Sequence, residues 1–332
     1  MASMFISNIE MLIEVDVQKV NEIPVVAMGG GHGLAATLTA LREITSDITA
    51  LVTVADDGGS SGRLRAEFGV LPPGDLRMAL AALCADDDWG RGWARVLQHR
   101  FSSAGELNGH SLGNLLLTAL WEIHEDPVIG LTKVGQLLRV VGRVLPMSPI
   151  PLDIEAVVHS MESGNSKRTI VRGQSAVALA RGVIEEVRLI PDSPPTHPEA
   201  LAAIARAEWI TLGPGSWYSS VLPHMLLPET RRALAETKAR KVLLLNLKAP
   251  NPGDEAADLG ARGRLEFLHR HAPKVGFDLI LADPSILTKE LAEFVTSLGA
   301  KLEVRDLAHA PTSDQHDPKK VVSALREIFE SF

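Results

Sequence analysis

The sequence contains a single cysteine, Cys84, among its 332 residues. One cysteine excludes an internal disulfide framework and any zinc site built from several thiolates. Aromatic residues make up only 4% of the chain, so we expect a core of valine, leucine, isoleucine and alanine. No apolar run reaches the roughly 20 residues that a membrane-spanning helix needs. These absences favour a cytoplasmic protein with no membrane span.

Excess positive charge is also missing. The formal net charge of −8 argues against a broad nucleic-acid-binding surface. Residues 1–22 have neither the basic start nor the small-residue cleavage site of a signal peptide, and we interpret them as an N-terminal extension. We expect residues 23–330 to form a single domain, which is large but within the range of α/β proteins.

Strands and helices alternate along both ends of the chain. The stretch "IPVVAMGGGHG" predicts a buried strand at Val25–Met28, a glycine turn and a helix, and "DITALVTVADD" predicts the next strand. Further strands are predicted at 209–212, up to Asn246, in "FDLILADPS" and in "KLEVRDLA", before a helix over Pro318–Phe332. This pattern predicts an α/β fold: a Rossmann-like, doubly wound, mostly parallel sheet with helices on both faces.

Three segments carry more local predictions. The alternating pattern of strands and helices is interrupted at residues 151–190. There the sequence predicts short strands joined by a turn at 163–165, forming a small β-rich insertion or an antiparallel edge. The stretch "GLTKVGQLLRVVGRVLPMS" predicts a helix that ends at Pro146. The pair Pro73-Gly74 precedes another predicted helix, with Asp75 as its N-cap.

A glycine turn follows the first predicted strand and consists of Gly29, Gly30, Gly31, His32 and Gly33. Backbone N–H groups and the helix dipole can hold phosphate at such a position, and the spacing loosely matches the dinucleotide fingerprint. Glycines at strand ends also serve simple tight turns, which is the alternative. The sequence has no GxxxxGK[ST] motif, and this excludes a Walker-type nucleotide site.

The stretch "VADDGGSSGR" places Asp56 and Asp57 at the carboxyl end of the second predicted strand. Extended backbone should point the two carboxylates apart. One carboxylate would accept ribose hydroxyls or bind Mg²⁺, with Asp57 as the metal ligand, while the other caps the segment that includes Ser60 and Ser61. The alternative is an Asx turn without a ligand.

A second glycine turn, "LGPGSWYSS", follows a strand in the C-terminal half and contains Gly213, Pro214, Gly215 and Ser216. On one parallel sheet the two turns would lie at the same edge and face each other across a crevice. Trp217 or Tyr218 would offer a ring face to a ligand, or else pack inside.

Other polar residues are candidates for the same crevice. Asn114, with His110 and Ser111 in "NGHSLGN", would contact the ligand or cap a helix. Asn246 and Lys248 follow a later strand, and Lys248 could neutralise phosphate. The acidic pair at 254–255 and the group Asp314, His316 and Asp317 are interpreted as exposed loops rather than metal ligands. No G-x-S-x-G elbow occurs, so a hydrolase triad is not supported.

Six segments in order resemble one family: "GGGHGL", "TALVTVADDGGSSGRLR", "LPPGDLR", "NGHSLGNL", "LGPGSWYSSVLPHMLLP" and "LNLKAPNPGD". The chain resembles the YvcK-like gluconeogenesis factors, which are related to 2-phospho-L-lactate transferase (CofD-like), over residues 24 to 320. The resemblance implies a Rossmann-like cytoplasmic bacterial protein that forms a homodimer. It also implies a bound UDP-N-acetylglucosamine-type sugar nucleotide or NAD, and a role in cell-wall synthesis and cell shape on gluconeogenic carbon sources.

The resemblance also bears on single residues. Gly29 to Gly33 match the family's first ligand turn, Asp56 and Asp57 its acidic pair, Asn114 the end of "GHSLGN", and 213–216 its second turn. His32 stands where many members have threonine, and the loop after Asn246 is longer than usual. The alternative function is a Mg²⁺-dependent transferase acting on a nucleotide diphosphate ester. A third, an NAD-dependent dehydrogenase, lacks an evident acid–base pair for hydride transfer.

Overall fold

The computed structural model describes residues 22–162, 165–247, 259–310 and 313–331. In these ranges seven parallel strands form one sheet in the order β10-β9-β8-β7-β1-β2-β3. The strands are β1 (Val25–Gly29), β2 (Ile48–Val52), β3 (Arg143–Pro146), β7 (Trp209–Leu212), β8 (Arg240–Leu244), β9 (Leu279–Ala282) and β10 (Lys301–Val304). β1 and β2 are buried along their whole length, because helices cover both faces of the sheet. The predicted α/β class is confirmed.

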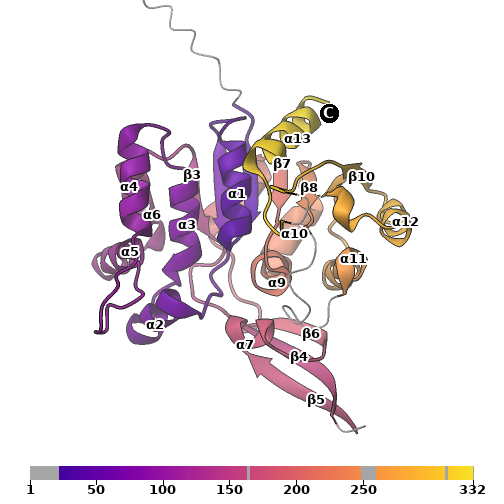
Figure 1. Ribbon diagram of the computed structural model, residues 1–332, viewed down its shortest axis with the longest axis horizontal. Helices are drawn as coiled ribbons and strands as arrows, with labels where there is room; N and C mark the ends of the chain where they lie inside the picture. Colours follow the sequence, from indigo (N-terminus) through magenta and orange to yellow (C-terminus); the bar gives the residue numbers. More distant parts are fainter. Residues whose placement is uncertain (1–21, 163–164, 248–258, 311–312, 332) are drawn as a thin grey trace, which may run out of the picture.

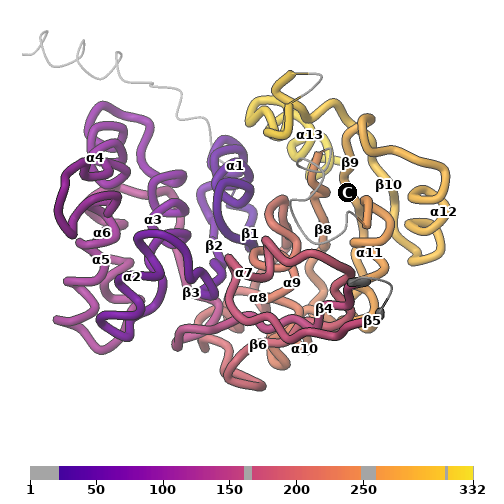
Figure 2. The backbone as a smooth tube through the Cα atoms, turned by 60° about the horizontal axis from the view of Figure 1, so that its bottom comes forward, coloured from indigo at the N-terminus to yellow at the C-terminus, as the bar shows by residue number. Residues whose placement is uncertain are grey.

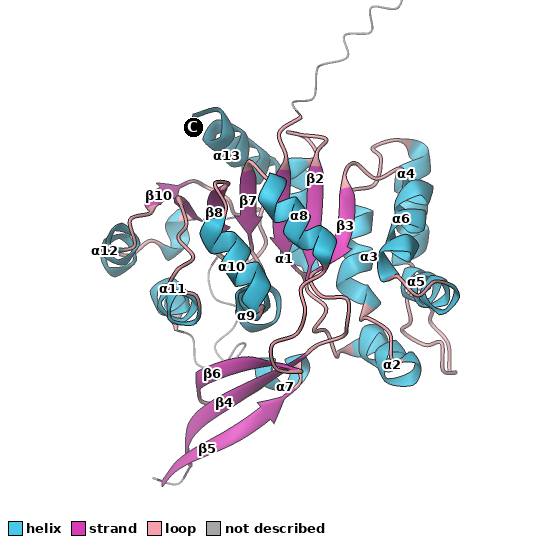
Figure 3. Cartoon of the chain, turned by 180° about the vertical axis from the view of Figure 1, so that it is seen from behind, coloured by secondary structure: helices cyan, strands magenta, loops and turns pink. Residues whose placement is uncertain are grey.

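Helices lie on both sides of the parallel sheet. Figure 1 shows α1 and α13 in front of it, and Figure 3 shows α8 and α10 on the opposite face. The helices of the first half are α1 (Gly31–Leu41), α2 (Gly59–Phe68), α3 (Pro73–Ala82), α4 (Asp88–Gln98), α5 (Leu112–Ile123), α6 (Pro127–Leu138) and α7 (Gln174–Ala178). Those of the second half are α8 (Pro198–Arg206), α9 (Leu222–Leu226), α10 (Pro228–Glu236), α11 (Gly260–His271), α12 (Lys289–Ser297) and α13 (Pro318–Ser331). Among the described helices, none is both long and apolar enough to cross a membrane.

The segment predicted as an insertion or an edge forms a second, antiparallel sheet. Its strands are β4 (Asp153–Glu162), β5 (Asn165–Arg172) and β6 (Val183–Ile190), in the order β5-β4-β6. Figures 1 and 2 show this sheet below the parallel one, on the side where the parallel strands end. It does not extend the edge of the main sheet. Arg65 of α2 contacts the start of the small sheet by donating to the carbonyl of Leu152 and to the carboxylate of Asp153.

Two predictions of local structure were wrong. The helix predicted up to Pro146 ends at Leu138, where Arg139 adopts φ 52°, and residues 143–146 instead form β3 beside β2. The apolar residues of that stretch suit a buried strand as well as a helix, so periodicity could not separate the two. Asp75, predicted as an N-cap, is instead the third residue of α3, which begins at Pro73.

An aromatic pair contributes to the packing of the C-terminal helix on the sheet. Phe329 of α13 stacks on Trp209 of β7 with ring centroids 4.4 Å apart, and Phe329 is only 8% exposed. We expect Phe329→Ala to lower the free energy of unfolding by about 3 kcal/mol, because it leaves a cavity against the sheet. Urea unfolding followed by circular dichroism measures this, with the exposed neighbour Glu330→Ala as control. Equal losses in the two variants would contradict the packing role.

Candidate functional site

The candidate site lies where the strand order reverses. From β1 the chain continues to β2 and β3 on one side, whereas β7 starts the other half of the sheet as the second neighbour of β1. In open α/β sheets, ligands bind at the carboxyl ends of the strands beside such a switch point. Both predicted glycine turns follow the two strands that flank it.

The two turns touch each other. Gly33 packs so closely on the carbonyl of Pro214 that a Cβ atom at position 33 would collide with it. The hydroxyl of Thr37 donates to the carbonyl of Gly213 over 3.1 Å, and a cis peptide joins Gly213 to Pro214. The turns therefore form one continuous floor across β1 and β7 rather than two separate loops.

Asn246, predicted from its place after β8, secures the second turn. Its Oδ1 accepts from the N–H of Gly215 and its Nδ2 donates to the carbonyl of Gly215, both over 2.9 Å. The side chain thus holds the backbone of the turn in place and stays half-exposed beside half-buried Ser216. Lys248 lies outside the described residues.

The first turn opens helix α1. Gly31, with φ 58°, starts the helix, and no side chain caps it at Gly30. The N–H groups of His32 and Gly33 have no hydrogen-bond partner among the described residues. Such free N–H groups at the start of an eleven-residue helix can bind an anion, assisted by the helix dipole.

Asp75 is a functional candidate that the sequence reasoning missed. The helix α3 begins at Pro73, so Asp75 is its third residue and not the predicted N-cap. The residue as a whole is half-buried, and protein atoms enclose its carboxylate on nearly all sides. The N–H of Gly31 hydrogen bonds to it.

Burial and, to a smaller extent, the nearby charge of Asp56 raise the pKa of Asp75 to about 7, against opposing effects of the Gly31 N–H and Arg77. Asp75 therefore changes charge near neutral pH at the start of α1. The motif "PPGD" was the available signal for this residue, but the pattern alone favoured a helix cap. Only the packing of α3 against the first turn shows the second role.

The carboxylates of Asp56 and Asp57 point apart, as extended backbone requires. Asp56 accepts from the N–H of Gly58 over 2.9 Å, which is the predicted Asx turn, and its other oxygen faces Gly74 at the start of α3. Asp57 accepts from the backbone N–H and the hydroxyl of Ser175, over 2.9 and 2.8 Å. Asp57 therefore connects the segment after β2 with α7, the short helix between β5 and β6.

Ser60, Ser61 and Asn114 join helices through buried hydrogen bonds. Ser61 Oγ accepts from the N–H of Gly74 over 3.0 Å. Ser60 Oγ lies 2.9 Å from Nδ1 of His110 and accepts from Asn114 over 3.0 Å. Asn114 in turn accepts from Nε of Arg77 over 2.8 Å. These polar side chains are buried, so their bonds hold the first turns of α2, α3 and α5 together.

The residues after the second turn are also internal. Trp217 and Tyr218 are buried, and Tyr218 packs edge-on against Phe267. His224 of α9 is fully buried, and its Nε2 lies 3.2 Å from the carbonyl of Gly29. Burial lowers the pKa of His224 to about 4, so the ring is neutral. It is a structural support of the first turn that no motif indicated.

The acidic group near the C-terminus is only partly exposed. Asp314 is exposed, whereas His316 is half-buried and its ring hydrogen bonds to the backbone of Leu245 at the end of β8. The acidic pair at 254–255 lies outside the described residues. Within those residues, no group of three or more His, Cys, Asp or Glu side chains could hold a metal ion.

Comparisons with known proteins identify the family to which this chain belongs. The model of the family described as 2-phospho-L-lactate transferase CofD matches residues 25–310. The chain belongs to the CofD family. Gluconeogenesis factors resemble it over most of its length, which confirms the resemblance found in the motifs. The relative from Mycobacterium leprae is 49% identical over 306 residues, covering 91% of this chain and 84% of the relative.

Other CofD-family relatives extend this agreement. The gluconeogenesis factor of Listeria innocua is 35% identical over 319 residues, covering 91% of this chain and 94% of the relative. A crystal structure of a UPF0052-family protein from Bacillus halodurans is 34% identical and superposes with a TM-score of 0.80, covering 92% of this chain and 99% of that one. The relatives therefore share the whole fold with this chain.

The raised pKa of Asp75 predicts a pH-dependent stability. Between about pH 4 and 7 the folded carboxyl keeps a proton that the unfolded chain has lost, so its contribution to stability falls as the pH rises. Asp75→Asn keeps an acceptor for Gly31 and removes this loss. We expect the variant to be more stable than the wild type above about pH 7, by roughly 3–4 kcal/mol.

Urea unfolding of both proteins between about pH 4 and 8 measures this difference. His224, whose pKa is lowered to about 4, changes stability in the opposite direction, but it does so in both proteins and cancels in the comparison. Equal stability of the two proteins at every pH would show that ionisation of Asp75 does not lower the free energy of unfolding.

Proposed function

We propose that this CofD-family protein binds a nucleotide sugar of the UDP-N-acetylglucosamine type in the crevice between β1 and β7. On this proposal it acts as a gluconeogenesis-factor regulator that supports cell-wall synthesis and cell shape on gluconeogenic carbon sources. The observation that carries the proposal is the contact between Gly33 and Pro214, which joins the two glycine turns into one floor beside the free N–H groups of α1.

The floor suits a diphosphate. Free N–H groups of His32 and Gly33 would donate to phosphate oxygens at the positive end of α1. Gly30 and Gly215 are required by packing, because a Cβ atom at either position would crowd a protein side chain, whereas a Cβ atom at Gly31 would meet only Asp75, at 3.9 Å. His32 is exposed beside them, and its ring could add a further donor to phosphate.

The carboxylates at the rim suit hydroxyl groups. Asp57 is half-exposed and its Oδ1 already accepts from one hydroxyl, that of Ser175. A ribose or sugar hydroxyl could form the same kind of bond with either oxygen. Asp75 lies nearer the diphosphate position, and its protonated form, favoured by burial, would avoid repulsion from a phosphate.

Mg²⁺ fits this site only together with a ligand. Asp57 has no second carboxylate beside it in a metal-binding group, so the described side chains do not form a cage for an ion. Mg²⁺ is commonly bound by one or two carboxylates and by substrate phosphates. Asp57 would hold the ion against a bound diphosphate, where the ion would neutralise phosphate charge.

Calorimetry tests the proposed ligand. We expect UDP-N-acetylglucosamine to bind the wild type, and Asp57→Asn to weaken the binding about tenfold or more, because an uncharged amide is a poorer acceptor for hydroxyls. Asp88→Asn, at a fully exposed carboxylate on α4, serves as the matched control and should bind as the wild type does. Mg²⁺ alone should release no heat, yet strengthen binding of the nucleotide.

NAD is the second ligand in the same titration. Tighter binding of NAD than of the sugar nucleotide would identify NAD as the ligand, at the same proposed site. Absence of binding by either compound at millimolar concentration would contradict the proposal.

The match of the transferase family model over residues 25–310 favours one alternative, a Mg²⁺-dependent transferase that uses a nucleotide diphosphate ester. The relevant assay combines a phospholactyl nucleotide donor with a deazaflavin acceptor and measures the transferred product. If the protein is this enzyme, turnover should require Mg²⁺ and fall about 100-fold or more in Asp57→Asn. A protein that binds the sugar nucleotide but forms no product is a regulator rather than this transferase.

A further inference from the structure

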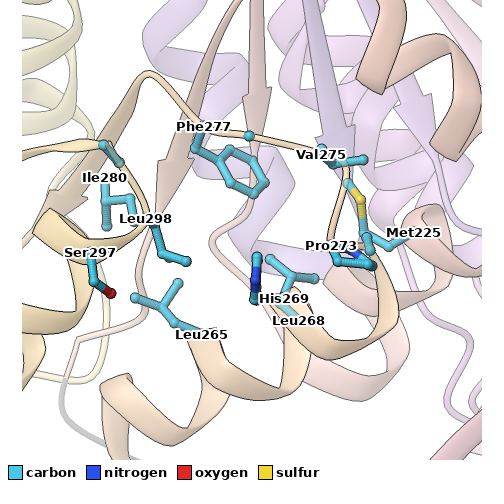
Figure 4. Close-up of a pocket in the computed structure, with 13 residues that line it drawn as sticks. Met225, Leu265, Leu268, His269, Pro273, Val275, Phe277, Ile280, Ser297 and Leu298 are labelled. Carbon is cyan, nitrogen blue, oxygen red and sulfur yellow. The ribbon is translucent and has the colours of Figure 1, made fainter.

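A cavity lies at the amino end of the sheet, away from the two glycine turns. Its volume is about 200 Å³, and it opens between α11, the end of α12 and the loop that leads into β9 (Figure 4). Ile280 of β9 and Phe277, which precedes that strand, place it at the strand starts, whereas the glycine turns follow strand ends. The cavity is therefore separate from the proposed nucleotide site.

The walls of this cavity belong to the hydrophobic core. Leu265 and Leu268 of α11, Ile280 of β9 and Met225 of α9 are all at most 3% exposed and line it. Figure 4 shows Phe277 facing Leu265 and Leu268 across the open space. Aliphatic groups, a methionine sulfur and a phenyl ring together favour contact with another ring.

The space exists because small residues stand where larger ones would fit. Ala272, Gly276 and Ala300 line the cavity. A Cβ added at Gly276 would meet no atom within 4 Å, and its backbone is not in the left-handed region that requires glycine. Packing therefore does not explain the small residue at position 276, and a larger side chain there could have filled part of the void.

Two polar groups mark the mouth. His269 is exposed, and its ring has no hydrogen-bond partner among the described residues. Ser297 donates its hydroxyl to the carbonyl of Phe294 over 2.6 Å, which leaves its oxygen free to accept. Among the described residues, no lysine, arginine, aspartate or glutamate lines the cavity, so a charged ligand would find no counter-ion there.

We infer that this cavity binds a small uncharged ring compound that carries one hydrogen-bonding group. An apolar cavity of about 150 Å³ accommodates benzene, so a volume of about 200 Å³ admits one ring with a substituent or a compact fused pair. The ring fills the space between Phe277 and the leucines of α11. The polar group reaches His269 or Ser297 at the mouth.

Indole is the probe for the test. In a titration followed by methyl NMR, indole should shift the methyl signals of Leu265, Leu268, Ile280 and Leu298, which line the cavity. Ser297→Leu places an aliphatic side chain over the mouth and should weaken indole binding about tenfold or more. Indole-3-acetate, which adds a carboxylate, should bind more weakly than indole.

Thr296→Leu is the matched control. Thr296 is the exposed neighbour of Ser297 on α12, it also donates its hydroxyl to a backbone carbonyl, and it does not line the cavity. This variant should bind indole as the wild type does, and thermal unfolding checks that both variants are folded. Unshifted cavity methyls, or equal binding by Ser297→Leu and the wild type, would overturn the inference. Tighter binding of indole-3-acetate would overturn the requirement for an uncharged compound.

Discussion

The contact between Gly33 and the carbonyl of Pro214 constrains the whole carboxyl edge of the sheet. It leaves no room for a side chain at position 33, so the turns after β1 and β7 must lie directly against each other. The bond from Thr37 to Gly213 and the two bonds between Asn246 and Gly215 then hold this arrangement in place. These contacts fix the start of α1, with its free N–H groups, against the turn after β7.

The run of small residues after Asp57 serves helix packing. Gly62 lies against the carbonyl of Asp57, and Gly74 against the hydroxyl of Ser61, with no space for a Cβ atom in either place. The first turn of α2 can therefore sit between those of α3 and α5, joined by buried serine and asparagine bonds. This packing directs Asp56 toward Asp75 and leaves Asp57 to contact α7.

Much of the fold could be predicted because strong local signals agreed with it. Apolar strands followed by glycine at 29 and at 213 indicated parallel strands with turns at one edge. The interruption of the strand and helix alternation after residue 150 indicated a separate β segment. The stretch 143–146 failed because its apolar residues fit a helix or a buried strand equally well. Its partner, β2, lies almost 100 residues earlier in the chain, and only that pairing decides between the two.

The sequence by itself determined the alternation of strands and helices, the position of both glycine turns and the divergence of the acidic pair, since each depends on neighbouring residues. The tertiary structure alone decided which polar residues face the crevice. Ser60, Ser61 and Asn114 look like ligand contacts in the sequence, yet they are buried against partners 13 to 54 positions away. Asp75 looks like a helix cap, yet it meets Gly31 across two packed helices. Burial and charge proximity arise only when distant segments come together, and these set both the contacts and the pKa of such groups.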